Sequence, residues 1–151
     1  MKIIFGASSG GHLEQLMMLK PLMQKYDSVL LTEKTDYDVT VDSVKTYYVR
    51  QINRKELLFP FKIIENTFKC LGIILREKPD VMITTGVLSV VPCVLLMKVF
   101  GKKLIYIESF AKVTSRTLSG KFLYRFADQF YVQWEEMLAL YPNAIYKGGI
   151  Y

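Results

Sequence analysis

The feature that most constrains the fold of this chain is a regular alternation of short apolar runs with longer segments of helical character. Seven runs have the length and the Val, Ile and Tyr content of β-strands: residues 2–5, 29–32, 46–49, 81–84, 104–107, 129–132 and 144–146. Helices are expected over residues 12–26, 61–78, 88–100, 121–127 and 135–140. Continuously apolar strands between helices are buried on both faces, so the pattern predicts an α/β fold with a Rossmann-like, doubly wound parallel sheet.

Length and composition are those of one globular unit. The chain has 151 residues, 51% of them hydrophobic, and we expect one domain over residues 1–151. Cys70 and Cys93 lie far apart in apolar segments without a Cys-x-x-Cys spacing, so we expect reduced core thiols and no zinc site. The net charge is +6, but the basic residues are scattered, and no nucleic-acid partner is expected.

A glycine-rich turn joins the first strand-like run to the first expected helix. Residues 6–12 read Gly-Ala-Ser-Ser-Gly-Gly-His, and such a turn presents backbone N–H groups that suit a phosphate or diphosphate. The spacing fits neither the dinucleotide fingerprint nor the nucleoside-triphosphate loop, which disfavours a dehydrogenase or an NTPase. The sequence leaves a second interpretation open, in which Gly10 and Gly11 only make a tight turn and His12 only caps the helix. Glu33, after the second strand, is placed where a dinucleotide fold would hold a ribose.

Ligands of open α/β sheets bind beyond the carboxyl ends of the strands. The loops that follow the first, fourth, fifth and sixth expected strands are rich in small and polar residues. Because several of these loops meet at one edge of the sheet, they supply the candidate substrate-binding residues Ser9, Gly10, Gly11, Thr85, Gly86, Ser109 and Trp134.

Several motifs in a fixed order resemble one protein family. They are Ser-Gly-Gly-His at residues 9–12, Pro-Asp at 79–80 before Thr-Thr-Gly at 84–86, Tyr-Ile-Glu-Ser at 106–109 before Ser-Gly-Lys at 119–121, Val-Gln-Trp at 132–134, and Tyr-Lys-Gly-Gly at 146–149. This series resembles the membrane-associated subunit of the two-part N-acetylglucosaminyltransferase that adds the second sugar to dolichol-linked oligosaccharides. It is also similar to the bacterial relatives of that subunit in capsule and exopolysaccharide operons.

The resemblance implies a division of labour between two chains. This chain would be the acceptor-side, N-terminal half of a GT-B glycosyltransferase, and a separate partner subunit would bind the UDP-sugar donor. The pair would transfer a sugar to a lipid-linked acceptor of the undecaprenyl-diphosphate type, and this chain would be inactive alone. No cofactor is expected. No metal is expected either, on the interpretation that the sequence lacks the Asp-x-Asp pair that would hold a divalent ion on the donor phosphates, so backbone dipoles and cations would carry the phosphate charge.

Two residues are candidates for the general base, and the sequence does not choose between them. His12, the only histidine, has an ordinary pKa near 6.5 that suits proton removal from an acceptor hydroxyl. Glu108 matches an acidic residue of the single-chain peptidoglycan transferase, and it could instead orient the acceptor, contact Ser109 or pair with Lys112. Two alternatives to a catalytic subunit stay open: a non-catalytic membrane scaffold or enhancer, and a stand-alone nucleotide-sugar-binding protein.

Membrane and partner contacts are expected from two further segments. The eukaryotic subunit begins with a membrane-spanning helix that this sequence lacks, so we expect a cytoplasmic protein held peripherally on the inner face of the plasma membrane. The membrane-contact residues would be Arg54, Lys55, Leu57, Leu58, Phe59, Phe61 and Lys62, unless this apolar run is ordinary core. The partner subunit would dock on Gly148, Gly149, Ile150 and Tyr151.

Overall fold

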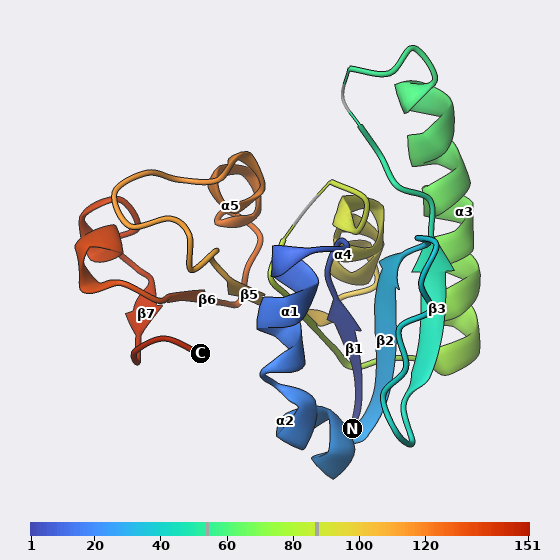
Figure 1. Ribbon diagram of the computed structural model, residues 1–151, viewed down its shortest axis with the longest axis horizontal. Helices are drawn as coiled ribbons and strands as arrows, with labels where there is room; N and C mark the ends of the chain where they lie inside the picture. Colours follow the sequence, from blue (N-terminus) through green and yellow to red (C-terminus); the bar gives the residue numbers. More distant parts are fainter. Residues whose placement is uncertain (54, 87) are drawn as a thin grey trace.

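The computed structural model describes residues 1–53, 55–86 and 88–151, and their strands form one parallel sheet (Figure 1). The order across the sheet is β3-β2-β1-β4-β5-β6-β7. The strands are β1 (Lys2–Gly6), β2 (Asp27–Glu33), β3 (Lys45–Val49), β4 (Val81–Thr84), β5 (Lys103–Ile107), β6 (Gln129–Val132) and β7 (Ile145–Tyr146). All seven expected strands are present and every pairing is parallel, which confirms the predicted doubly wound sheet.

Helices connect the strands except between β2 and β3, and one helix is broken where the sequence analysis did not expect it. They are α1 (Gly11–Met17), α2 (Lys20–Lys25), α3 (Phe59–Glu77), α4 (Val91–Val99), α5 (Leu118–Leu123) and the 3-10 helix η1 (Glu135–Ala139). The single helix expected over residues 12–26 is wrong, because Pro21 lies in the first turn of α2. Proline has no N–H with which to continue the hydrogen bonds of α1. Within the described ranges, no helix combines the length and apolar character that a membrane span requires.

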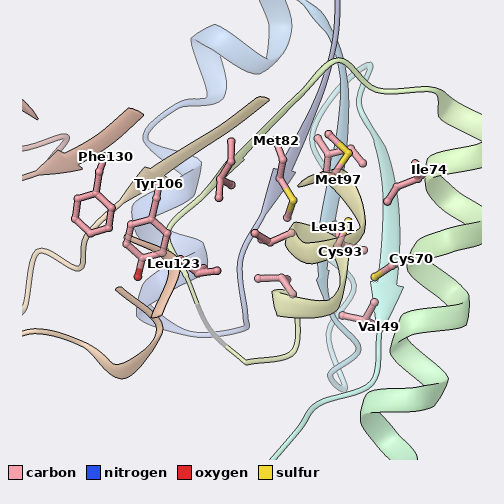
Figure 2. Packing of buried hydrophobic residues seen from close by; sticks show 14 of the residues in the cluster. Leu31, Val49, Cys70, Ile74, Met82, Cys93, Met97, Tyr106, Leu123 and Phe130 are labelled. Atoms are coloured by element: carbon pink, nitrogen blue, oxygen red, sulfur yellow. The ribbon is translucent and has the colours of Figure 1, made fainter. Parts of the chain in front are cut away.

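The two faces of the sheet bury separate hydrophobic clusters. Ile4 faces α3 and α4, whereas its neighbours Ile3 and Phe5 face α1 and α2, as the two-residue period of a strand requires. Figure 2 shows the first cluster, in which Cys70 of α3 lies near Cys93 of α4. Both thiols are free and buried, as expected. The neighbouring Cys70 thiol and burial hold the pKa of Cys93 well above its ordinary value.

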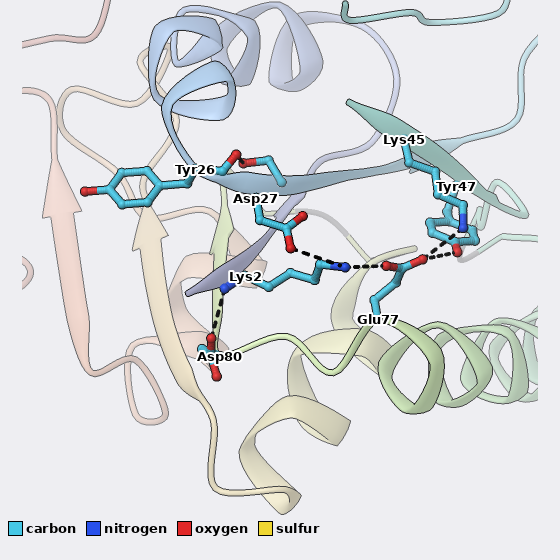
Figure 3. A network of polar contacts seen from close by, with 8 residues as sticks. Lys2, Tyr26, Asp27, Lys45, Tyr47, Glu77 and Asp80 are labelled. Atoms are coloured by element: carbon cyan, nitrogen blue, oxygen red, sulfur yellow. Dashed lines mark hydrogen bonds and ion pairs between the residues drawn. The ribbon is translucent and has the colours of Figure 1, made fainter. Parts of the chain in front are cut away.

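A polar network ties the amino-terminal edge of the sheet together (Figure 3). Glu77, at the end of α3, accepts hydrogen bonds from Lys2 Nζ at 2.7 Å, from Lys45 Nζ at 2.9 Å and from the hydroxyl of Tyr47. These three donors lower the pKa of Glu77 to about 2. Because ligands of parallel sheets bind at the opposite, carboxyl edge, we interpret this network as structural.

Candidate functional site

The amino-terminal turns of α1, the loop after β5 and the carboxyl-terminal residue line an open cavity of about 320 Å³ at the carboxyl edge of the sheet. We call it the histidine cavity. Four of the predicted site residues line it together: Gly11, His12 and Ser109, and also Tyr151, which was expected as a partner contact. The sequence analysis missed the other lining residues, which are Gln15, Phe110 and Ala111.

His12 is oriented by the loop after β4. Its Nδ1 lies 3.0 Å from the carbonyl oxygen of Thr85, and the Thr85 hydroxyl donates to the carbonyl oxygen of His12 at 2.9 Å. A carbonyl oxygen only accepts, so Nδ1 carries the proton in this contact, and in a neutral ring Nε2 is left as the acceptor. This tautomer is the one that a general base needs.

Thr85 and Gly86 directly follow β4, and neither is among the described residues that line the cavity. The side chain of Thr85 is fully buried and engaged with His12. Gly86 has a φ of 96°, and a Cβ there would lie 2.6 Å from the hydroxyl oxygen of Tyr106. The geometry therefore makes Thr85 a positioning residue for His12 and leaves Gly86 packed against Tyr106, where the sequence analysis expected substrate contacts.

A buried carboxylate holds the glycine-rich turn. Glu33, at the end of β2, accepts hydrogen bonds from the backbone N–H of Ser9 at 3.1 Å and from its hydroxyl at 2.8 Å. The ribose-binding interpretation of Glu33 is therefore wrong, because the carboxylate is buried and tethers Ser9. Gly10 and Gly11 are exposed, and Gly10 has a φ of 77°, which explains the need for glycine there.

Glu108, the second candidate base, points into the protein. Only 1% of the residue is exposed, and it is not among the described residues that line the histidine cavity. Its Oε1 accepts from Ser109 N at 2.9 Å and from Thr117 Oγ1 at 2.8 Å, while Oε2 accepts from the Tyr141 hydroxyl at 2.7 Å. In the part of the chain that the structure describes, Glu108 makes no ion pair with Lys112.

The surroundings of Glu108 are built to receive this carboxylate. A Cβ at Gly120 would collide with Oε2, so only glycine fits at that position of α5. Thr117 Oγ1 also accepts the N–H of Gly120 at 2.8 Å and thereby caps α5. Burial and the neighbouring Glu108 raise the pKa of the Tyr141 hydroxyl, which stays a donor at neutral pH. The contacts indicate that Glu108 fixes the loop between β5 and α5.

Trp134 does not present a free ring to the histidine cavity. Its Nε1 donates to the carbonyl oxygen of Phe110 at 2.7 Å, and its ring lies 4.8 Å from the Phe110 ring. Since Trp134 is not among the described lining residues, the geometry does not favour the expected sugar contact. Trp134 supports Phe110 instead, and Phe110 forms part of the cavity wall.

The carboxyl-terminal segment, residues 148–151, folds back over the sheet. Gln133 links it to the site, because its Oε1 accepts from Ile150 N at 3.1 Å and its Nε2 donates to the carbonyl oxygen of Glu108 at 2.8 Å. Ile150 packs on the cluster beneath α1 and α2, whereas Tyr151 is 62% exposed and contacts Phe110 edge-on. Ile150 is therefore half-buried against this chain's own core, and Tyr151 is the more exposed of the two side chains.

The expected membrane segment is apolar and largely exposed. Leu57 is 98% exposed, and Leu58 and Phe61 are also exposed. Phe59 is half-buried, and Lys62 is engaged in an ion pair with Glu56, so these two are weaker candidates. Arg54 lies outside the described residues. The ordinary-core alternative is wrong for Leu57, Leu58 and Phe61.

The expectation that the chain lacks an Asp-x-Asp pair is wrong. Asp36-Tyr37-Asp38, in the loop after β2, is an Asp-x-Asp sequence, the usual ligand pair for a divalent ion on donor phosphates. Asp38 is an exposed residue that forms an ion pair with Lys34. Across residues 1–53, 55–86 and 88–151, no three His, Cys, Asp or Glu side chains gather as they would around a metal ion.

Solved structures resemble this chain in their fold. MurG of Acinetobacter baumannii superimposes with a TM-score of 0.70 at 18% identity, over 89% of this chain and 42% of that one. A UDP-N-acetylglucosamine 2-epimerase of Rickettsia bellii superimposes with a TM-score of 0.74 at 12% identity, over 99% of this chain and 45% of that one. The chain spans less than half of each structure, in agreement with the expected fold of one half of a GT-B protein.

Comparison of sequences identifies the family. The model of the family described as "Oligosaccharide biosynthesis protein Alg14 like" matches residues 22–150. The UDP-N-acetylglucosamine transferase subunit ALG14 of Yarrowia lipolytica is 30% identical over 97% of this chain and 80% of its own length. The human subunit of that name is 33% identical over 69% of this chain. The match spans about half of the human protein, 54% of its length. The chain therefore belongs to the Alg14-like family of oligosaccharide biosynthesis proteins.

Proposed function

We propose that this chain is the acceptor-side subunit of a two-component glycosyltransferase in capsular or exopolysaccharide synthesis. It recruits a separate donor-binding subunit, forms a heterodimer with it and is inactive alone. The pair transfers a sugar from a UDP-sugar to an acceptor linked to a lipid diphosphate of the undecaprenyl type. The observation that carries the proposal is the orientation of His12 by Thr85 beside an open cavity, in a chain of the Alg14-like family.

In this proposal His12 is the catalytic base. Nε2 removes the proton from the acceptor hydroxyl, the hydroxyl oxygen attacks the anomeric carbon of the donor sugar, and UDP leaves. Gly10, Gly11 and Ser109 contact the acceptor, while Ser9 is held by Glu33 and keeps the turn in place. Thr85 and Glu108 are positioning residues, because both act through the groups to which they are hydrogen-bonded.

The proposal places the chain peripherally on the inner face of the plasma membrane. Lys55, Leu57, Leu58 and Phe61 contact the bilayer, since exposed apolar side chains beside a cation favour an interface with anionic headgroups. Residues 148–151 contact the partner subunit, for which the exposed ring of Tyr151 provides an anchor.

The test uses this chain reconstituted with its partner transferase and a lipid-linked acceptor in vesicles. His12→Asn keeps an N–H that can donate to Thr85 but removes the Nε2 base, so turnover should fall about 10²- to 10⁴-fold. Thermal stability should be unchanged, and Glu14→Gln, an exposed change on α1, serves as the matched control. A wild-type rate for His12→Asn would refute the catalytic role and favour the non-catalytic enhancer.

The stand-alone alternative has a separate test. A nucleotide-sugar-binding protein that works alone would bind UDP-N-acetylglucosamine without the partner. Isothermal titration of the isolated chain with this nucleotide sugar should show no binding if the donor site belongs to the partner. Saturable binding would favour the alternative.

A further inference from the structure

A second cavity, of about 650 Å³, lies between the segment before α3 and the loop before α5. We call it the cationic cavity. The first segment contributes Asn53 and Lys55, the loop contributes Lys112 and Arg116, and Ser119 comes from the first turn of α5. This loop begins at Ser109 and Phe110, which line the histidine cavity, so one loop borders both cavities.

The cationic cavity carries positive charge that the protein does not neutralise. Lys55, Lys112 and Arg116 line it, and no carboxylate is among its described lining residues. Ion pairs in the described part of the chain engage Arg50 and Lys62 nearby, but none engages the three lining cations. Three positive charges around the cationic cavity favour an anionic ligand.

Arg116 is held in place by neutral groups. Its guanidinium lies 5.1 Å from the centre of the Tyr141 ring and donates to the carbonyl oxygen of Leu140. Both contacts fix the side chain and leave its full charge available to a ligand. The Tyr141 hydroxyl also donates to Glu108. The carboxylate that fixes the loop therefore also fixes the ring on which Arg116 packs.

Exposed apolar side chains border these cations. Leu118 lines the cationic cavity and is largely exposed, and Leu57 follows Lys55 by two positions. A ligand that fits cations on one side and hydrocarbon on the other is a phosphate ester carried on a lipid. A diphosphate fits three cations better than the single phosphate of a common phospholipid, because it carries more charge and more acceptor oxygens.

We propose that the cationic cavity binds the diphosphate of the lipid-linked acceptor. Lys112 and Arg116 contact phosphate oxygens, and Lys55 closes the site on the membrane side. The inference rests on the proposed function and adds to it a diphosphate subsite outside the glycine-rich turn. The shared loop then leads from the bound diphosphate to the histidine cavity, where the acceptor sugar is positioned.

The direct test measures binding of the full chain to vesicles. Three compositions are compared: neutral phosphatidylcholine, the same lipid with undecaprenyl diphosphate, and the same lipid with a charge-matched amount of phosphatidylglycerol. Lys112→Gln/Arg116→Gln should weaken binding to the diphosphate vesicles about tenfold or more, as expected for the loss of charge-assisted contacts. Binding to the phosphatidylglycerol vesicles should change much less.

The matched control is Lys78→Gln/Lys102→Gln, which removes two charges next to the amino ends of β4 and β5, at the far edge of the sheet. An equal effect of the two double variants would overturn the proposal, because it would reflect net charge alone. Lys112→Gln and Lys55→Gln are tested singly as well, since neither side chain makes the packing contacts that Arg116 makes with Tyr141.

Two other outcomes would also overturn the diphosphate assignment. Equal weakening on diphosphate and phosphatidylglycerol vesicles would identify a phospholipid headgroup site. Unchanged vesicle binding with lost capture of the partner subunit would identify a protein interface.

Kinetics of the reconstituted pair separate this proposal from the catalytic one. The cationic-cavity variant should raise the KM for the acceptor with little change in kcat, whereas His12→Asn should lower kcat. An effect of the first variant without an effect of the second would support the subsite and refute the role of His12. The reverse result would refute the subsite and leave the role of His12 in place.

Discussion

Glu108→Gln separates a structural from a chemical role for the buried carboxylate. Glu108 accepts three hydrogen bonds of 2.7–2.9 Å, from Ser109 N, Thr117 Oγ1 and the Tyr141 hydroxyl. Glutamine keeps the volume and one acceptor oxygen. Its NH₂ group replaces the oxygen that faces Tyr141, so the hydroxyl must turn and accept.

The expected cost follows from these contacts. A hydrogen bond to a charged group contributes about 1.5–3 kcal/mol, and one between neutral groups about 1 kcal/mol. Exchanging charge-assisted bonds for neutral ones costs about 0.5–2 kcal/mol per bond, and removal of a buried charge offsets part of the sum. We therefore expect the free energy of unfolding to fall by roughly 2 kcal/mol, or about 4–8 °C in Tm for a domain of this size. Glu108→Ala should cost more, about 3–5 kcal/mol, because it leaves buried donors without an acceptor.

Thermal unfolding followed by circular dichroism measures this loss. Tyr141→Phe removes only one of the three donors and is the matched control. The double variant Glu108→Gln/Tyr141→Phe should lose less than the sum of the two single variants, because they share one hydrogen bond. Turnover of the reconstituted pair, measured well below Tm, should stay within about threefold of wild type, since in the proposed mechanism the proton goes to His12.

The reverse result would refute this reasoning. If Glu108→Gln keeps the wild-type Tm and turnover falls about 10²-fold or more, the carboxylate takes part in the chemistry. Glu108 would then be the base, and its hydrogen bonds would have to rearrange when the acceptor binds.

Three further changes test other parts of the molecule. Leu58→Ser/Phe61→Ser should weaken co-sedimentation with anionic vesicles at unchanged Tm, whereas Phe59→Ser should also lower Tm because Phe59 is half-buried. A large fall in Tm for the double variant would contradict membrane contact. Glu77→Gln should lower the free energy of unfolding at neutral pH. The difference from wild type should close as the pH falls from about 4.5 towards 2, since the lowered pKa contributes stability only while the carboxylate is ionised. A difference that persists at pH 2 in urea unfolding would refute this account. Deletion of residues 149–151 should abolish co-purification with the partner and leave the far-ultraviolet spectrum unchanged, and undiminished co-purification would exclude docking there.

The strands were predictable from sequence because each is a short, continuously apolar run that a parallel sheet buries on both faces. The break between α1 and α2 was visible in Pro21, but the helical period of the flanking residues outweighed it in the prediction. The positions of the site loops also followed from the strand order, since carboxyl ends of parallel strands share one edge.

The direction in which loop side chains point was not predictable. Glu108 and His12 both follow strands and both suit a base, yet one is buried under Tyr141 and the other lines a cavity. That difference depends on contacts between segments more than 30 residues apart in the chain, such as Tyr141 with Glu108. Gln133 carried a signal in its motif, but its bond to Ile150 arises only once the end of the chain folds back.

The position of Tyr151 links assembly to substrate binding. This side chain forms part of the wall of the histidine cavity and also belongs to the segment proposed to meet the partner. A partner that moves or fixes Tyr151 changes the shape of the space offered to the acceptor. By thermodynamic reciprocity, any factor by which the partner tightens acceptor binding equals the factor by which bound acceptor tightens the heterodimer. If the partner tightens acceptor binding, the membrane-borne acceptor binds paired chains in preference to unpaired ones, and its binding in turn favours the heterodimer.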